Sequence, residues 1–292
     1  MTVEFAKPID FSKTLPRFEE RFPMEMAILR LGGVYPGMDK GIKNPYTYEY
    51  DLEYRGNIGE HCFAVALYAK NIADRVLGEN HTKTKEIESN ALVHDSTKGY
   101  EIMRRNAVRI GKIEDAYSPT AYETIKLILE HQKVSPTIVE YMAKAGSETG
   151  HNSLKDFVKI ENGKPALVTE ENIAEMIVHL ADDMTFTSIV QVGETAETYF
   201  LTTAERQEAA DFPNKYPFLY TEGFGFNQEG EVVFVKDVSQ ADPNFEHVKT
   251  YSEWQVWIAK EMAKYLVGIL EPNKQIENPE KYLKDLVNAN LR

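Results

Sequence analysis

An imidazole and a carboxylate stand side by side in the apolar segment at residues 90–98, where Leu92 and Val93 precede the pair His94-Asp95. Ionisable side chains in such a setting are costly unless a partner compensates them, and a bound metal ion does this well. The pair therefore constrains the fold, because other segments have to bring further ligands to it. Candidate ligands beside other apolar helical patterns are His61, His131, His151 and the Asp182-Asp183 pair.

The first of these ligands lies on a predicted helix. Apolar residues such as Val65 and Ile72 recur at helical spacing, which predicts a helix over residues 58–77 that ends before Gly78. His61 precedes Val65 by four residues and therefore shares its inward-facing side. We expect His61 to face the same core as His94.

Proline, glycine and apolar spacing define the remaining elements. Further helices are predicted over residues 84–95, 118–131, 135–145, 169–184 and 251–270. β-forming residues on both sides of Gln228-Glu229-Gly230 predict one β-hairpin. The predicted fold class is all-α, a helical core with a small β-hairpin appendage near the C-terminus.

The chain divides into three predicted parts by composition and pattern. Residues 1–50 form an irregular and partly helical N-terminal extension, and residues 51–210 form the metal-binding helical domain. Residues 211–292 form a C-terminal part, with a β-hairpin and helices that pack on the core.

Composition excludes several functions. The net charge of −13 leaves no basic surplus to replace counterions on phosphates, so general nucleic-acid binding is not expected. No apolar run approaches the roughly 18 residues of a membrane span, and no signal peptide is recognisable. The single cysteine, Cys62, rules out an internal disulfide and favours a reducing compartment. We therefore expect a cytoplasmic protein without a membrane partner, and self-association into a homo-oligomer stays open.

The spacing of the ligands suits a centre of one or two metal ions. Paired ions need a bridging carboxylate and several neutral nitrogen ligands, and water that they share is acidic enough to attack phosphorus. Asp95 is the natural bridge because it adjoins His94. One ion would be completed by His61 and an aspartate of the Asp182-Asp183 pair, and the second would be held by His131 and His151.

In this order the residues resemble the HD-domain superfamily of metal-dependent phosphohydrolases. The segment ALVHDSTK at residues 91–98 is similar to the central motif of that family, and IVHLAD at residues 177–182 is similar to its terminal segment. The second likeness selects Asp182 over Asp183 as the ligand. The central motif of the family often continues Ile-Gly-Lys, whereas this chain has Ser96-Thr97-Lys98.

The resemblance implies a helical HD core around residues 55–190 and hydrolysis of phosphomonoesters, phosphodiesters or nucleotides. The ion would be manganese, iron, cobalt, nickel, zinc or magnesium. Asp95 and Lys98 are the predicted catalytic residues, with Lys98 one turn after the metal-binding pair. Arginine binds phosphate through paired hydrogen bonds, so the substrate-binding residues predicted beside Lys98 are Arg104, Arg105 and Arg109.

Two other functions fit the same residues. The family also resembles myo-inositol oxygenase, and ligands of this type suit iron, so a di-iron oxygenase is one alternative. A non-catalytic sensor that keeps the fold and binds a nucleotide is the other. Bound iron with oxygen consumption would favour the oxygenase, and lack of metal binding would favour the sensor.

Overall fold

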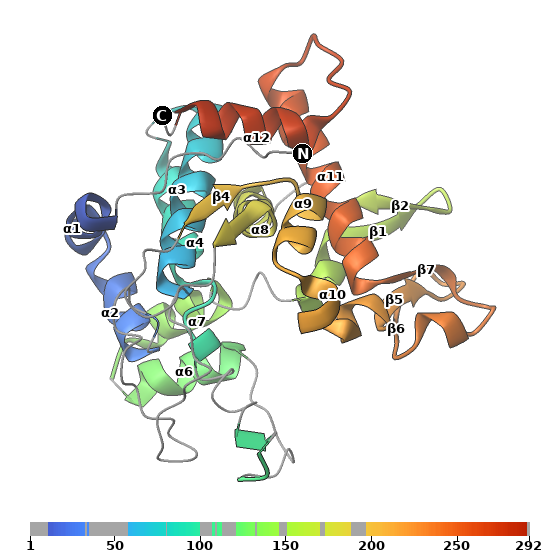
Figure 1. Ribbon diagram of the computed structural model, residues 1–292, viewed down its shortest axis with the longest axis horizontal. Coiled ribbons are helices and arrows are strands. Elements are labelled where there is room, and N and C mark those ends of the chain that lie inside the picture. Colours follow the sequence, from blue (N-terminus) through green and yellow to red (C-terminus); the bar gives the residue numbers. More distant parts are fainter. Residues whose placement is uncertain are drawn as a thin grey trace. The chain divides into compact units, whose positions relative to one another are not determined.

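The computed structural model describes residues 11–32, 34, 58–79, 81–99, 107–108, 110–112, 121–131, 133–145, 151–169, 173–187 and 197–290. In these residues the chain is mostly helical and carries three small β-sheets (Figure 1). The all-α prediction is therefore wrong, and the fold class is mixed α/β. The chain folds into two compact units whose segments alternate along the sequence.

The first unit comprises residues 1–70, 82–148 and 187–199. Its described helices are α1 (Phe11–Arg21), α2 (Pro23–Leu31), the first part of α3 (Ile58–Leu77), α4 (Thr82–Val93), α6 (Ala121–His131) and α7 (Pro136–Ala145). Helix α4 contacts both α2 and α7, and α6 packs on α7. The segment that carries the His-Asp pair therefore begins in the interior of this unit.

Two contacts tie helix α1 to the rest of the first unit. The ring of Phe18 meets the ring of Phe63 on α3 edge to face, with 4.8 Å between the centroids. The guanidinium of Arg21 donates two hydrogen bonds, of 3.0 and 2.6 Å, to the carboxylate of Glu88 on α4. Glu88 is fully buried, so this paired contact supplies the compensation that a buried carboxylate needs.

The second unit comprises residues 71–81, 149–186 and 200–292. Its helices, besides the end of α3, are η1 (His151–Phe157), α8 (Ile173–Met184), α9 (Thr203–Ala209), α10 (Phe212–Lys215), η2 (Pro217–Tyr220), η3 (Val238–Gln240), α11 (Tyr251–Leu270) and α12 (Pro279–Asn290). Its paired strands are β1 (Val158–Glu161) with β2 (Lys164–Leu167), and β5 (Gly223–Phe226) between β6 (Val232–Val235) and β7 (Glu246–Thr250).

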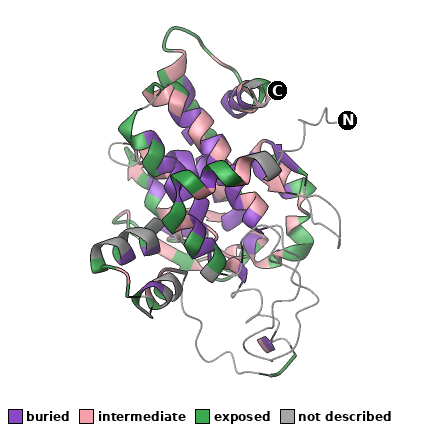
Figure 2. Cartoon of the chain, turned by 90° about the vertical axis from the view of Figure 1, so that its left-hand side faces the viewer, coloured by how far each residue is buried: buried purple, intermediate pink, exposed green. Residues whose placement is uncertain are grey.

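The core of the second unit forms where α11 meets the three-stranded sheet. Trp254 is fully buried, stacks on Phe224 with 4.9 Å between ring centroids, and donates a 2.8 Å hydrogen bond to the Phe224 carbonyl. A capping box of Thr250 and Glu253 satisfies the first N–H groups of α11. Buried residues recur along the inward sides of the long helices, as Figure 2 shows. The sheet and the helix therefore share one apolar interior.

Several predicted boundaries are confirmed. Helix α3 spans Ile58–Leu77 and is followed by Gly78, whose φ of 94° suits glycine at a helix C-terminus. Helix α11 spans the predicted 251–270, and the predicted hairpin is the antiparallel pair β5–β6. Helix α4 ends at Val93, so His94 and Asp95 lie in the turn after the helix rather than in its last turn.

Two of the strands that were not predicted, β2 and β7, are short and half-exposed. Strand β2 has three intermediate residues in a row, and β7 has four, so neither shows the alternation that identifies a strand. A further two-stranded sheet pairs β3 (Thr185–Thr187) with β4 (Thr198–Phe200). Among the described residues, no helix combines the length and the apolar character that crossing a membrane requires.

Candidate metal centre

Helix α3 and the turn after α4 bring three candidate ligands together in the first unit. His61, His94 and Asp95 each offer one ligand atom, and these atoms lie within 4.8 Å of one another. The imidazole rings of the two histidines are 5.3 Å apart between centroids and tilted by 60°. Such spacing lets the two rings and the carboxylate approach one cation from different directions.

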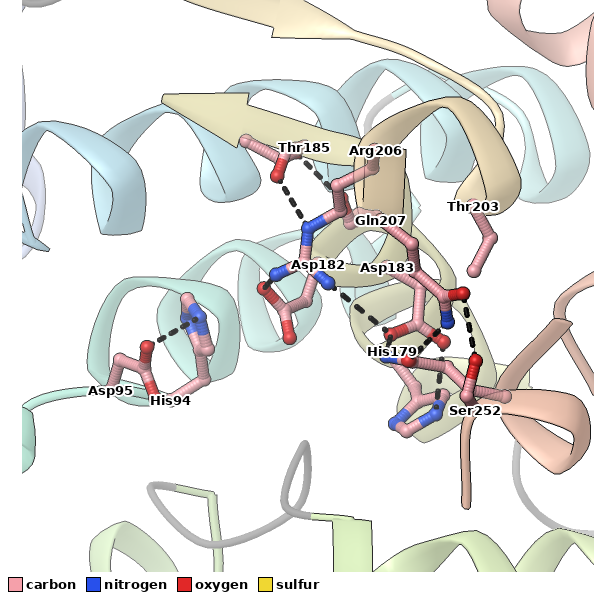
Figure 3. A network of polar contacts seen from close by, with 12 residues as sticks. His94, Asp95, His179, Asp182, Asp183, Thr185, Thr203, Arg206, Gln207 and Ser252 are labelled. Atoms are coloured by element: carbon pink, nitrogen blue, oxygen red, sulfur yellow. Dashed lines mark hydrogen bonds and ion pairs between the residues drawn. The ribbon is translucent and has the colours of Figure 1, made fainter. Parts of the chain in front are cut away.

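His94 is held in one orientation by its own helix end. Its side chain is fully buried, and Nδ1 lies 2.7 Å from the carbonyl oxygen of Ala91. A carbonyl oxygen can only accept, so Nδ1 carries the hydrogen and Nε2 keeps its lone pair. Nε2 lies 3.9 Å from Oδ2 of Asp95, the contact drawn in Figure 3. Nε2 is therefore the nitrogen that His94 offers to a metal.

His61 and Asp95 are less buried than His94. The Asp95 side chain is 27% exposed, so its carboxylate faces both the histidines and the solvent. His61 is half-buried, and its Nδ1 lies 3.4 Å from the hydroxyl oxygen of Thr187. Both of these candidate ligands therefore keep some exposed surface.

The turn that carries the pair packs against the end of α2. A Cβ atom added to Gly32, the residue that follows α2, would lie 1.9 Å from the carbonyl oxygen of Ser96. Hydrogen bonds from Ser96 N to Val93 O and from Lys98 N to Asp95 O, both 3.0 Å, close the turn from inside. Because Gly32 has no side chain, the backbone of Ser96, the residue after Asp95, can pack directly against it.

Gly32→Ala is expected to displace this turn and to weaken divalent metal binding by about 10-fold or more, because ligand geometry tolerates little misplacement. The crowding should also cost about 1–3 kcal/mol of unfolding free energy. Titration with Co²⁺ and denaturant unfolding measure the two effects. Gly268→Ala in α11 is the control, because its Cβ meets nothing within 4 Å; wild-type metal affinity in Gly32→Ala would contradict the prediction.

Asp182 lies on α8, in the second unit, and it already has a cationic partner there. Nη2 of Arg206, from α9, lies 3.4 Å from Oδ1 of Asp182, and Nη1 lies 3.9 Å from Oδ1 of Asp183. Nε of Arg206 donates a 2.9 Å hydrogen bond to the carbonyl of Thr185. One guanidinium thus compensates both carboxylates, as Figure 3 shows.

Asp183 is the more deeply buried of the two aspartates, with no exposed surface. Gln255 donates a 2.5 Å hydrogen bond to its Oδ1, and Gln207 and Ser252 continue the network at 2.9 Å each. Nε2 of His179 lies 3.3 Å from its Oδ2. Asp183 and His179 therefore belong to a buried structural network on α8.

The pKa of His179 reflects this network. Burial alone would lower the pKa of the ring, but the charge of Asp183 and the contact with its carboxylate act in the opposite direction. Asp182 adds to this effect and Arg206 opposes it, and the net result is a raised pKa. The protonated form of His179 is thus favoured beside the two aspartates.

The other predicted site residues are placed as follows. Lys98 is half-buried in the helical turn that follows Asp95. His131 is the last residue of α6 and His151 the first of η1, and their side chains lie outside the described residues. The three arginines predicted to bind substrate, Arg104, Arg105 and Arg109, also lie outside them. Asp182 and the second-ion ligands therefore stay predictions.

The sequence patterns do not reveal the residues that contact the candidate ligands or the turn that carries them. Gly32 and Arg206 act through contacts with segments far away in the sequence, which spacing does not reveal. Thr187 ends the run Thr185-Phe186-Thr187, whose alternation of β-branched and aromatic residues is the one local signal for strand β3.

Comparison of the chain with protein-family models, with curated proteins and with solved structures finds no match. A function for this chain therefore has to be inferred from its residues and their geometry.

Proposed function

We propose that this chain is a metal-dependent phosphohydrolase of the HD type that acts on a small phosphorylated or nucleotide substrate. The observation that carries the proposal is the group of His61, His94 and Asp95 within 4.8 Å. Two imidazole nitrogens and one carboxylate oxygen fit a divalent first-row metal ion. The fixed tautomer of His94, with Nδ1 bonded to Ala91, supports the same use.

In this proposal, some residues of the chain bind metal and others bind the phosphoryl group. His61, His94 and Asp95 would hold the first ion, and Asp95 would bridge to a second ion, for which His131 and His151 are the predicted ligands. When bound, such an ion supplies Lewis acidity toward a phosphoryl oxygen and lowers the pKa of water toward neutrality. Lys98 follows the pair by one turn, so its ammonium group can balance charge on a phosphoryl group. The remaining phosphate oxygens would be bound by the arginines that follow in the sequence, Arg104, Arg105 and Arg109.

A second candidate function follows from the same three residues. Two histidines and one carboxylate are the ligand set of non-haem iron(II) oxygenases, in which the remaining positions of the ion are open. An iron-dependent oxygenase is therefore the alternative, and the identity of the bound metal separates it from a hydrolase.

The deciding experiment is the metal content per chain, measured by elemental mass spectrometry on protein purified without an affinity metal or a chelator. We expect one to two equivalents of a divalent first-row ion and hydrolysis of at least one member of a panel of phosphomonoesters, phosphodiesters and nucleotides. Iron with oxygen consumption, measured with an oxygen electrode, would favour the oxygenase. A chain that stays metal-free after incubation with manganese, cobalt, zinc and iron would refute both functions.

A further inference from the structure

The small sheet of β3 and β4 carries two threonine hydroxyl groups that contact each other, and one of them also contacts His61. Thr198 has no exposed surface, and its Oγ1 lies 3.4 Å from Oγ1 of Thr187. Oγ1 of Thr187 in turn lies 3.4 Å from Nδ1 of His61. All three residues belong to the first unit. The unpredicted sheet thus contacts the imidazole of His61 at Nδ1, through Thr187.

One arrangement of hydrogens along these two contacts suits a histidine that binds a metal. Thr198 donates its hydroxyl hydrogen to Oγ1 of Thr187. A hydroxyl oxygen has two lone pairs, so Oγ1 of Thr187 can also accept from the ring N–H of His61. A histidine that binds a metal commonly donates its other ring N–H to a fixed oxygen. With Nδ1 of His61 as the donor, Thr187 accepts from both neighbours, and Nε2 of His61 keeps the lone pair that a metal requires.

We propose that Thr187 and Thr198 are positioning residues that hold His61 in the tautomer with hydrogen on Nδ1. His61 then offers Nε2 to the metal, as His94 does through its contact with Ala91. The contacts of 3.4 Å are long for hydrogen bonds, as those of catalytic groups often are before ligands bind. This inference rests on the proposed metal site, but the tautomer itself can be measured without metal.

The first test is the tautomer of His61 in metal-free protein, read from ¹⁵N chemical shifts at pH 8.5, where imidazole is neutral. We expect the form with hydrogen on Nδ1 in the wild type. Thr187→Val keeps the shape of the side chain and removes the acceptor, so the ring should shift toward the form with hydrogen on Nε2. Thr187→Ser, which keeps the hydroxyl, should restore the wild-type signal.

The control is Thr185→Val, on the same strand. Thr185 is buried, whereas Thr187 is half-buried, and the hydroxyl of Thr185 donates a 2.6 Å hydrogen bond to the Ala181 carbonyl. Its loss should cost stability like any buried hydrogen bond, and it should leave the His61 tautomer unchanged. A change in Thr185→Val as large as that in Thr187→Val would show a general loosening of the fold and would overturn the inference.

The second test is Co²⁺ affinity by isothermal titration calorimetry. Removal of a hydrogen-bond partner of a metal ligand typically weakens binding by about 10–100-fold, and we expect this range for Thr187→Val. Thr198→Val should act in the same direction by a smaller factor. If wild-type protein bound no Co²⁺, the proposed function would fail, and the tautomer result would still decide the inference. An unchanged tautomer with unchanged Co²⁺ affinity in Thr187→Val would refute it.

Discussion

Asp95→Ala is expected to abolish metal binding and phosphoester hydrolysis together. Asp95 supplies the single carboxylate in the group with His61 and His94, so its loss leaves two neutral nitrogens and no charge to balance a divalent cation. Loss of metal affinity by more than about 100-fold is expected, since changes around the ligands alone cost 10–100-fold. Titration calorimetry with Co²⁺ or Mn²⁺ and a phosphatase assay measure the two losses.

The same substitution should leave the fold intact. The side chain of Asp95 is 27% exposed and lies in a turn, so its removal should change the unfolding free energy by about 1 kcal/mol or less. Asp156→Ala is the matched control, because that aspartate is exposed and forms an ion pair with its sequence neighbour Lys155. Retained activity in Asp95→Ala, with metal still bound, would remove Asp95 from the proposed site.

The sequence was informative where local rules decide the structure. The ends of α3 and α11 follow from glycine at 78 and from the capping residue Thr250, which act within a few residues of the helix. The meeting of His61 with His94 follows from periodicity, because Val65 and His61 share one side of α3 and that side is turned inward. Helical spacing was therefore enough to predict that His61 lies beside His94 and Asp95, the other two candidate ligands.

The strands were missed because their stability is not local. Strand β7 pairs with β5 although neither its composition nor its burial alternates. Its pairing depends on the close approach of a glycine strand, at Gly223 and Gly225, to the backbone at 246–250. Such contacts across the sequence override weak propensities, which is why an all-α prediction failed for a largely helical chain.

The surroundings of the two aspartates on α8 were also not predictable from the sequence. The sequence selected Asp182 as a ligand by resemblance, and it gave no sign that Arg206 lies 3.4 Å away. Arg206 stands on α9, which follows α8 after the β3–β4 segment, and no spacing rule relates the two positions. The pairing of Arg206 with the two buried aspartates of α8 is therefore seen only in the structure.

Arg206→Met is expected to destabilise the protein by about 3–5 kcal/mol at pH 8, because it leaves two buried carboxylates without their guanidinium. Asp182 and Asp183 are 8% and 0% exposed, so water cannot replace the lost charge. Methionine keeps most of the side-chain volume, which limits the effect of packing. Urea unfolding followed by circular dichroism measures the change. Lys284→Met, which breaks an ion pair with the more exposed Glu205, should cost about 1 kcal/mol or less.

The loss in Arg206→Met should be smaller at pH 5.5 than at pH 8. The folded protein raises the pKa of His179, so the protonated ring adds stability below its ordinary pKa of about 6.5 and loses this effect as the pH rises through the raised value. In acid, the imidazolium beside Asp183 partly replaces the missing guanidinium. His179→Phe in the Arg206→Met background removes that cation and should abolish the difference between the two pH values. An equal loss at both pH values in Arg206→Met alone would show that packing, rather than charge, is the main contribution of Arg206.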